Sequence, residues 1–193
     1  MTDQATKEAI AQLVPMGSRV LDLGCGDGAM LAHLQKTRQC TGYGVEIDDA
    51  NVLACVQRGV NVIQLNLDEG LALFGDASFD VVLQLDTLQH LRNAEVMLRE
   101  TVRVGREGIV AFPNFAHWPN RLSIMKGRMP VTRRLPYQWY DTPNIRVGTH
   151  ADLGELAVRS GLKVLDSFGL QEGVTVRTWP NLMAGTSVYR LSR

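Results

Sequence analysis

The sequence predicts an α/β protein with a mostly parallel sheet of seven strands, helices on both faces and an antiparallel strand at the edge. Three observations lead to this fold class. Short apolar runs alternate with helix-length segments, a glycine-rich turn follows the first apolar run, and the 193 residues contain no internal repeat. Alternating strands and helices pair as parallel strands joined by crossover helices, so we expect one domain spanning residues 1–193.

The individual elements follow from local signals. Pro15 and Gly17 separate a first helix from a first strand, and Gly59 ends the helix that Asp48 or Asp49 begins. Near the C-terminus, Thr149 and Asp152 have the spacing of a capping box, and Gly161 ends that helix. We expect helices at 7–13, 29–36, 51–58, 93–103 and 152–159, and strands at 19–23, 41–46, 60–65, 79–85, 108–112, 163–168 and 187–191, the last two as an antiparallel edge pair.

Composition limits the classes of function. Twenty basic and twenty acidic residues give a net charge of zero, which argues against binding duplex nucleic acid through broad electrostatic attraction. Cys25, Cys40 and Cys55 are odd in number and lack Cys-x-x-Cys spacing, so we expect buried thiols rather than disulfides or a zinc site. Residues 2–8 are polar, and no apolar run approaches the roughly 18 residues of a membrane span. We therefore expect a cytoplasmic protein that binds no metal, membrane or nucleic acid.

The most informative motif joins a glycine-rich turn to an acid. Gly24, Cys25, Gly26 and Gly28 directly follow the first strand, and glycines at alternate positions let the backbone turn sharply and approach a ligand closely. Glu46 ends the next strand 18 residues after Gly28, near the distance of about 20 residues at which an acid binds ribose hydroxyls. The pair predicts a nucleotide-binding turn in which the backbone of Cys25 matters more than its sulfur.

Two nucleotide cofactors fit such a turn. The looser dinucleotide pattern is satisfied, but Asp22 stands two residues before Gly24, where its carboxylate would repel the pyrophosphate of NAD. S-adenosylmethionine has no phosphate and carries an ammonium and a sulfonium, so Asp22 and Asp27 become favourable neighbours. The chain here resembles the class I methyltransferases, whose Rossmann-like fold binds this cofactor. The resemblance implies that Asp22 faces the methionyl end, that the glycines form the turn and that Glu46 binds the ribose of S-adenosylmethionine or S-adenosylhomocysteine.

The ends of the other strands complete the expected cofactor site, because ligands of open α/β sheets lie beyond the carboxyl ends of the strands. Ile47 follows the acid of the second strand, and Leu85 ends the fourth, near the expected sulfonium methyl. Asn66 and Leu67 follow the third strand, where the resemblance implies contact with adenine. Asn66 departs from the aspartate usual there; its oxygen can still accept a hydrogen bond, or the residue is a turn former.

His90 is a weak candidate for a catalytic base, because the ordinary pKa of histidine is close to neutrality. A single histidine at the start of a helix is more often a cap or a surface residue. The methyl group of the cofactor is already activated, so methyl transfer does not require a base.

Residues 113–148 form an insert with unusual composition, which holds five of the seven prolines and two of the three tryptophans. A long connection rich in aromatics predicts an ordered flap. Its six basic residues face a single acid, Asp141, so the surface suits an acidic small molecule, single-stranded nucleic acid or a protein. We expect the partner or acceptor to contact Trp118, Arg128, Arg133, Arg134, Trp139 and Tyr140. The alternative is a lid that packs over the cofactor.

With the insert included, the chain resembles the bacterial methionine-biosynthesis family MetW over nearly its whole length. The similarity is carried by the stretches 20–28, 43–48, 58–64, 86–89, 112–118 and 127–144. It implies a role in making methionine beside a homoserine O-acyltransferase, which the family is thought to support as a partner. Two functions stay open: an accessory protein that binds S-adenosylmethionine, and a methyltransferase acting on a small acidic metabolite.

Overall fold

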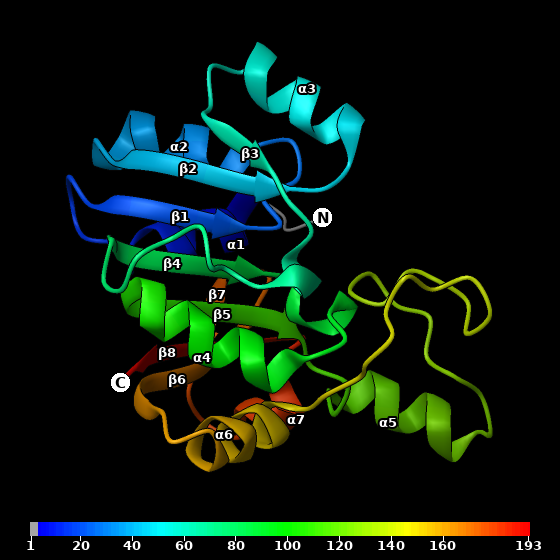
Figure 1. Ribbon diagram of the computed structural model, residues 1–193. Coiled ribbons are helices and arrows are strands. Elements are labelled where there is room, and N and C mark those ends of the chain that lie inside the picture. The colour runs from blue at the N-terminus through cyan, green and yellow to red at the C-terminus, as the bar shows by residue number, and fades with distance from the viewer. Residues whose placement is uncertain (1–3) are drawn as a thin grey trace.

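The computed structural model describes residues 4–193, which form one eight-stranded sheet with helices on both sides (Figure 1). Its strands are β1 (Arg19–Leu23), β2 (Thr41–Glu46), β3 (Val62–Gln64), β4 (Phe79–Leu85), β5 (Gly105–Pro113), β6 (Lys163–Gln171), β7 (Val174–Val176) and β8 (Thr186–Ser192). Its helices are α1 (Gln4–Ala11), α2 (Ala29–Arg38), α3 (Asp49–Gln57), α4 (Ala94–Val104), α5 (Trp118–Met125), α6 (His150–Arg159) and α7 (Pro180–Met183), with short 3-10 helices η1 (Leu67–Glu69) and η2 (Leu88–His90). Residues 1–3, part of the polar N-terminal stretch, lie outside the described residues.

The strand order is β3-β2-β1-β4-β5-β8-β6-β7. The strands from β3 to β5 are parallel, and β8 runs antiparallel to both of its neighbours. After β1 the chain builds outward through β2 and β3, and then returns to place β4 on the other side of β1. The order of strands therefore reverses between β1 and β4, and a ligand of an open α/β sheet is expected beyond the carboxyl ends of these two strands.

Both faces of the sheet are buried, so neighbouring residues of a strand enter different cores. Val20 belongs to a cluster with α1 and α2, whereas Leu21 belongs to a cluster on the opposite face with the loop before β4. Val110 of β5 packs in a third cluster with α4 and α6. Apolar residues at successive positions are typical of parallel strands covered on both sides. This arrangement confirms the predicted helix, sheet and helix layers.

The prediction was wrong about the number of strands and about one position in the sheet. β7 is an eighth strand, only three residues long, and it pairs with the end of β6 at the edge. β6 and β8 are antiparallel neighbours as expected, but β8 lies inside the sheet between β5 and β6. A strand of three residues, two of them exposed, leaves little hydrophobic pattern in the sequence.

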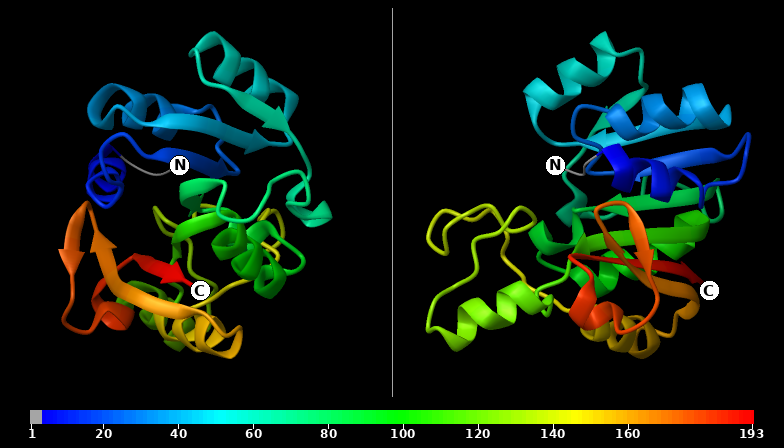
Figure 2. Two further views of the ribbon diagram at one scale, coloured as in Figure 1. Left: turned by 60° about the vertical axis from the view of Figure 1, so that its left-hand side comes forward. Right: turned by 180° about the vertical axis from the view of Figure 1, so that it is seen from behind.

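The insert projects from the sheet at the end where β1, β2, β4 and β5 finish (Figure 1), and the view from behind shows the same projection (Figure 2, right). It contains one element that the sequence analysis missed, α5, which begins at Trp118 and has proline in its first turn. The base of the insert is held by Asn114, which is 1% exposed. Its amide donates to the carbonyl oxygen of Ala184 at 2.8 Å, and its side-chain oxygen accepts from the backbone of Ala116 and His150. The insert is therefore an ordered part of the fold.

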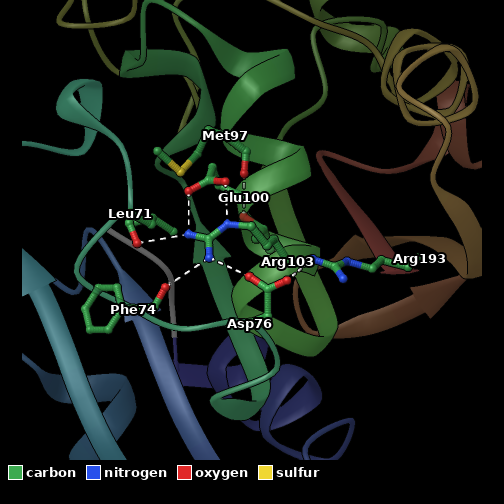
Figure 3. A network of polar contacts seen from close by, with 8 residues as sticks. Leu71, Phe74, Asp76, Met97, Glu100, Arg103 and Arg193 are labelled. Carbon is green, nitrogen blue, oxygen red and sulfur yellow. Dashed lines mark hydrogen bonds and ion pairs between the residues drawn. The ribbon is translucent and has the colours of Figure 1, made fainter.

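At the other end of the sheet, where β4 and β5 begin, Arg103 joins α4 to the loop after η1 (Figure 3). Its guanidinium donates to the carbonyl oxygens of Leu71 and Phe74, both at 3.0 Å, and forms ion pairs with Glu100 and Asp76. Hydrogen bonds of charged donors are stronger than neutral ones. This network stabilises the fold far from the strand ends that form the site.

Candidate cofactor site

The three glycines of the turn have left-handed backbone conformations, but their surroundings differ. A Cβ atom on Gly24 would lie 2.6 Å from the Oγ1 of Thr87, and one on Gly28 would lie 3.0 Å from the Sγ of Cys55. A Cβ on Gly26, with φ of 56°, would meet no heavy atom within 4 Å. Gly24 and Gly28 are thus required by protein packing, whereas Gly26 faces open space that a ligand can enter.

Glu46 connects this turn to the end of β2. Its carboxylate accepts a hydrogen bond from the backbone N–H of Gly26 at 2.8 Å, and further bonds from the backbones of Ile47 at 2.8 Å and Asp48 at 3.1 Å. The acid and the glycines that the sequence linked across 20 residues are therefore in direct contact. A carboxylate has about four acceptor sites, so Glu46 keeps capacity for a ribose hydroxyl.

A cavity of about 570 Å³ lies above the turn, within the range of roughly 300–1,000 Å³ typical of small-molecule sites. Five residues of the predicted cofactor site line this cavity: Asp22, Gly24, Cys25, Gly26 and Leu85. The other walls come from α1, α2, the loop after β4 and the insert: Lys7, Asp27, Ala29, Met30, Asn51, Asp86, Gln89, His90, Pro113, Arg133, Arg134, Pro136, Tyr137, Pro143 and Asn144.

Asp22 is the buried acid of this cavity, with 2% of its surface exposed. Burial, and then repulsion from Glu46, raises the pKa of Asp22 to about 7. Asp27, the other acid of the turn, is half-exposed and forms an ion pair with Arg58 at 2.7 Å. The charge of Asp27 is thus already compensated by Arg58, whereas burial and Glu46 both disfavour the ionised form of Asp22, which a cation in the cavity would stabilise.

The cysteines are all buried and unpaired. The Sγ atoms of Cys25 and Cys55 lie 3.7 Å apart, and the thiol of Cys55 donates to the carbonyl oxygen of Gly26 at 3.2 Å. Burial raises the pKa of both thiols, so they remain protonated and pack as small apolar groups. Cys25 lies where its backbone was expected, inside the ligand turn.

The loop after β4 adds two residues that bear on chemistry. The Nδ1 of His90 lies 3.1 Å from the carbonyl oxygen of Pro143, and because a carbonyl only accepts, the ring donates there and keeps Nε2 as its acceptor in the neutral form. Asp86, which the sequence analysis did not select, lines the cavity with φ of 54°, a conformation uncommon for a residue with a side chain. The sequence signal that could have identified Asp86 as a site residue is its place directly after a predicted strand.

Other predicted residues lie outside the cavity wall. The side-chain oxygen of Asn66 accepts from the backbone of Asp68 at 3.1 Å, so Asn66 caps η1 as a turn former does. Leu67 is buried in the core, and Ile47 is 58% exposed on the outside of the turn. Gly28 begins α2. The structure therefore gathers residues of the first strand, the glycine turn and the fourth strand around the cavity, whereas Glu46, which contacts Gly26, and the residues that follow β3 are not part of its wall.

The insert contributes to two different surfaces. Arg133 and Arg134 line the cavity. The aromatic residues face outward, with Trp118 47%, Trp139 72% and Tyr140 71% exposed, and Arg128 is exposed as well. Trp139 and Tyr140 pack edge to face with ring centroids 5.6 Å apart. The insert therefore forms part of the cavity wall through Arg133 and Arg134 and carries exposed aromatic residues on its surface.

Within residues 4–193, no helix has the length and apolarity needed to cross a membrane. The same part of the chain contains no group of three His, Cys, Asp or Glu residues placed to hold a metal ion.

Comparison with solved structures shows the fold. A methyltransferase dependent on S-adenosylmethionine from Mesorhizobium loti matches with a TM-score of 0.73 at 17% identity, covering 98% of each chain. A possible histamine N-methyltransferase from Thermotoga maritima matches with a TM-score of 0.70 at 20% identity, covering 97% of this chain and 87% of the other. Both agree with the predicted class I methyltransferase fold.

Comparison of sequences shows the family. The bifunctional methionine biosynthesis protein MetXA/MetW of Rhodopirellula baltica is 36% identical over the whole of this chain and 33% of its own length. Ajmaline N-methyltransferase of Rauvolfia serpentina is 30% identical over 46% of this chain and 33% of its own length. The chain thus spans about a third of the length of these curated relatives. The family model described as methionine biosynthesis protein MetW matches residues 4–191, and the chain therefore belongs to the MetW family.

Proposed function

We propose that this protein binds S-adenosylmethionine in the cavity above the Gly24–Gly28 turn and acts in methionine biosynthesis by supporting a homoserine O-acyltransferase. The observation that carries the cofactor assignment is the hydrogen bond from Gly26 to Glu46 beneath an open space. It supports the proposal because an acid suited to accept hydrogen bonds from ribose hydroxyls lies next to a turn whose central glycine lines the cavity. Asp22 supplies the negative charge that the ammonium and sulfonium of the cofactor require.

When bound, the cofactor supplies an activated methyl group, and its loss leaves S-adenosylhomocysteine. The chain's own residues position the ligand. Glu46 accepts from the ribose hydroxyls, Asp22 attracts the methionyl ammonium, and Leu85 bounds the space in front of the sulfonium. The insert covers the cavity and excludes water from it.

The partner assignment rests on the family and on the outer surface of the insert. The Rhodopirellula baltica relative is a bifunctional MetXA/MetW protein, and this chain matches about a third of it, so a second functional part accompanies the MetW part there. In the present chain, Trp118, Trp139 and Tyr140 are large exposed aromatics on a segment that projects from the sheet (Figure 1). Aromatic residues of this kind, rimmed by arginines, are enriched at protein interfaces.

Calorimetry tests the cofactor assignment. S-adenosylmethionine and S-adenosylhomocysteine should bind, and NAD should not. Binding of NAD with none of the sulfonium cofactor would overturn the proposal.

A double variant tests the partner assignment. Trp139→Ala combined with Tyr140→Ala should abolish binding to, and support of, the homoserine O-acyltransferase of the same organism, while cofactor affinity stays within a fewfold. Trp179→Ala is the matched control, because Trp179 is 73% exposed but lies outside the insert. If the insert is only a lid, the double variant will lose cofactor affinity and retain the acyltransferase.

A further inference from the structure

The cavity has walls of opposite charge. Asp22 and Asp27 lie on the side of the glycine turn, where the proposed cofactor binds, whereas Lys7, Arg133 and Arg134 lie on the sides formed by α1 and the insert. A net excess of basic groups on one side of a small-molecule site favours an anionic ligand group there. The insert side of the cavity thus differs in chemistry from the cofactor side.

Arg134 has hydrogen-bonding capacity that the protein does not use. Its terminal nitrogen lies 3.5 Å from the carboxylate of Asp86, longer than the 2.7–2.9 Å usual for a charge-assisted bond. Its Nε is buried and has no hydrogen-bond partner among residues 4–193. A guanidinium carries five N–H donors, and a buried donor without a partner costs free energy. The side chain of Arg134 is nevertheless held in place, since only 19% of it is exposed.

An unused acceptor lies on the same loop as Asp86. Gln89 is 8% exposed and lines the cavity, and its amide donates to the carbonyl oxygen of Asp86 at 2.9 Å. Its Oε1 is buried and has no hydrogen-bond partner in the described part of the chain. Asp86 follows Leu85, at the strand end next to the proposed position of the sulfonium methyl. Arg134 and Gln89, which carry the unused donor and acceptor, therefore both line the cavity that Leu85 and Asp86 also line.

We propose that this part of the cavity binds a second ligand, a small carboxylic acid with a hydroxyl or amino group, beside the bound cofactor. Arg134 binds the carboxylate, which replaces the 3.5 Å contact between Arg134 and Asp86, and the Oε1 of Gln89 accepts a hydrogen bond from the hydroxyl or amino group. The inference rests on the proposed function, since the cofactor fills the other side of the cavity.

Calorimetry on the protein saturated with S-adenosylhomocysteine tests the proposal, with L-malate as the probe and its uncharged diamide as the matched compound at constant ionic strength. Malate should bind at least about tenfold more tightly than the diamide, because a charged hydrogen bond is lost with the carboxylate. Arg134→Gln should weaken malate binding by about tenfold or more, and Arg134→Lys, which keeps the charge but not the planar fork, should give an intermediate loss. Lys126→Gln should have no effect, because Lys126 is an exposed basic residue of the same insert that does not line the cavity.

Three results would overturn the proposal. One is equal binding of malate and its diamide, and another is unchanged malate binding in both Arg134 variants. The third is competition between malate and S-adenosylhomocysteine together with weaker cofactor binding by Arg134→Gln, which would assign the basic wall to the cofactor's own carboxylate. Failure of the proposed function is distinguishable, because S-adenosylhomocysteine would then not bind the wild-type protein before any malate is added.

Discussion

We predict that cofactor affinity rises with pH across neutrality because of Asp22. Its pKa of about 7 in the free protein results from burial and from the neighbouring Glu46. About one-tenth of Asp22 is then ionised at pH 6 and about nine-tenths at pH 8. If only the ionised form attracts the ammonium and sulfonium, affinity should increase about ninefold between these two pH values.

The direction of this pH dependence follows from whether the free protein or the complex binds more protons. The cofactor lowers the pKa of Asp22, so the complex holds fewer protons than the free protein, and binding at pH 7 should release about half a proton. Calorimetry in buffers with different ionisation enthalpies measures this release directly. His90 also lines the cavity, so Asp22→Asn is the necessary control. The reasoning is refuted if Asp22→Asn keeps the wild-type pH slope, or if wild-type affinity falls as pH rises.

Three further substitutions separate the site from the fold. Gly26→Ala should weaken cofactor binding and lower the melting temperature only through the strain of its left-handed backbone, whereas Gly24→Ala should lower the melting temperature further, since its Cβ would also lie 2.6 Å from Thr87; equal melting temperatures for the two variants would contradict this difference. Glu46→Gln should weaken cofactor binding by roughly 1.5–3 kcal/mol in calorimetry, and an unchanged affinity would show that Glu46 does not contact the ribose. Arg103→Gln should lower the free energy of unfolding in urea by about 2–4 kcal/mol with unchanged cofactor affinity, and a loss of affinity would mean that the two ends of the sheet are coupled.

The central part of the fold could be predicted because local signals agree with tertiary packing there. The strand after the first turn was placed at its observed bounds, Thr41–Glu46, and so was Phe79–Leu85. The expected capping box of Thr149 is present, with both of its hydrogen bonds formed. In these segments the apolar residues, the caps and the glycines all favour one structure, which is the condition under which sequence reasoning succeeds.

The insert and its relation to the cavity could not be predicted, because the local signals there are weak and the structure depends on contacts between residues far apart in the chain. α5 has a proline in its first turn and leaves much of its surface exposed, so it has no strong apolar stripe to identify it. The approach of Arg134 to Asp86 joins residues 48 positions apart, and the position of Arg134 depends on how the whole insert folds back over the sheet. At Asn66 a local role competes with a predicted one. The residue caps η1, whereas its place after a predicted strand had suggested contact with adenine.

The geometry of the turn also bears on the choice between NAD and S-adenosylmethionine. A dinucleotide places its pyrophosphate on the backbone N–H groups of the glycine turn. Here the N–H of Gly26 donates to the carboxylate of Glu46, and Asp22 lies buried in the wall of the same cavity. A pyrophosphate would therefore meet carboxylates and lose the central amide, while a ligand with an ammonium and a sulfonium gains from the same charges. The three hydrogen bonds that hold Glu46 in place therefore disfavour binding of a phosphate group, because they keep a carboxylate beside the turn and occupy its central amide.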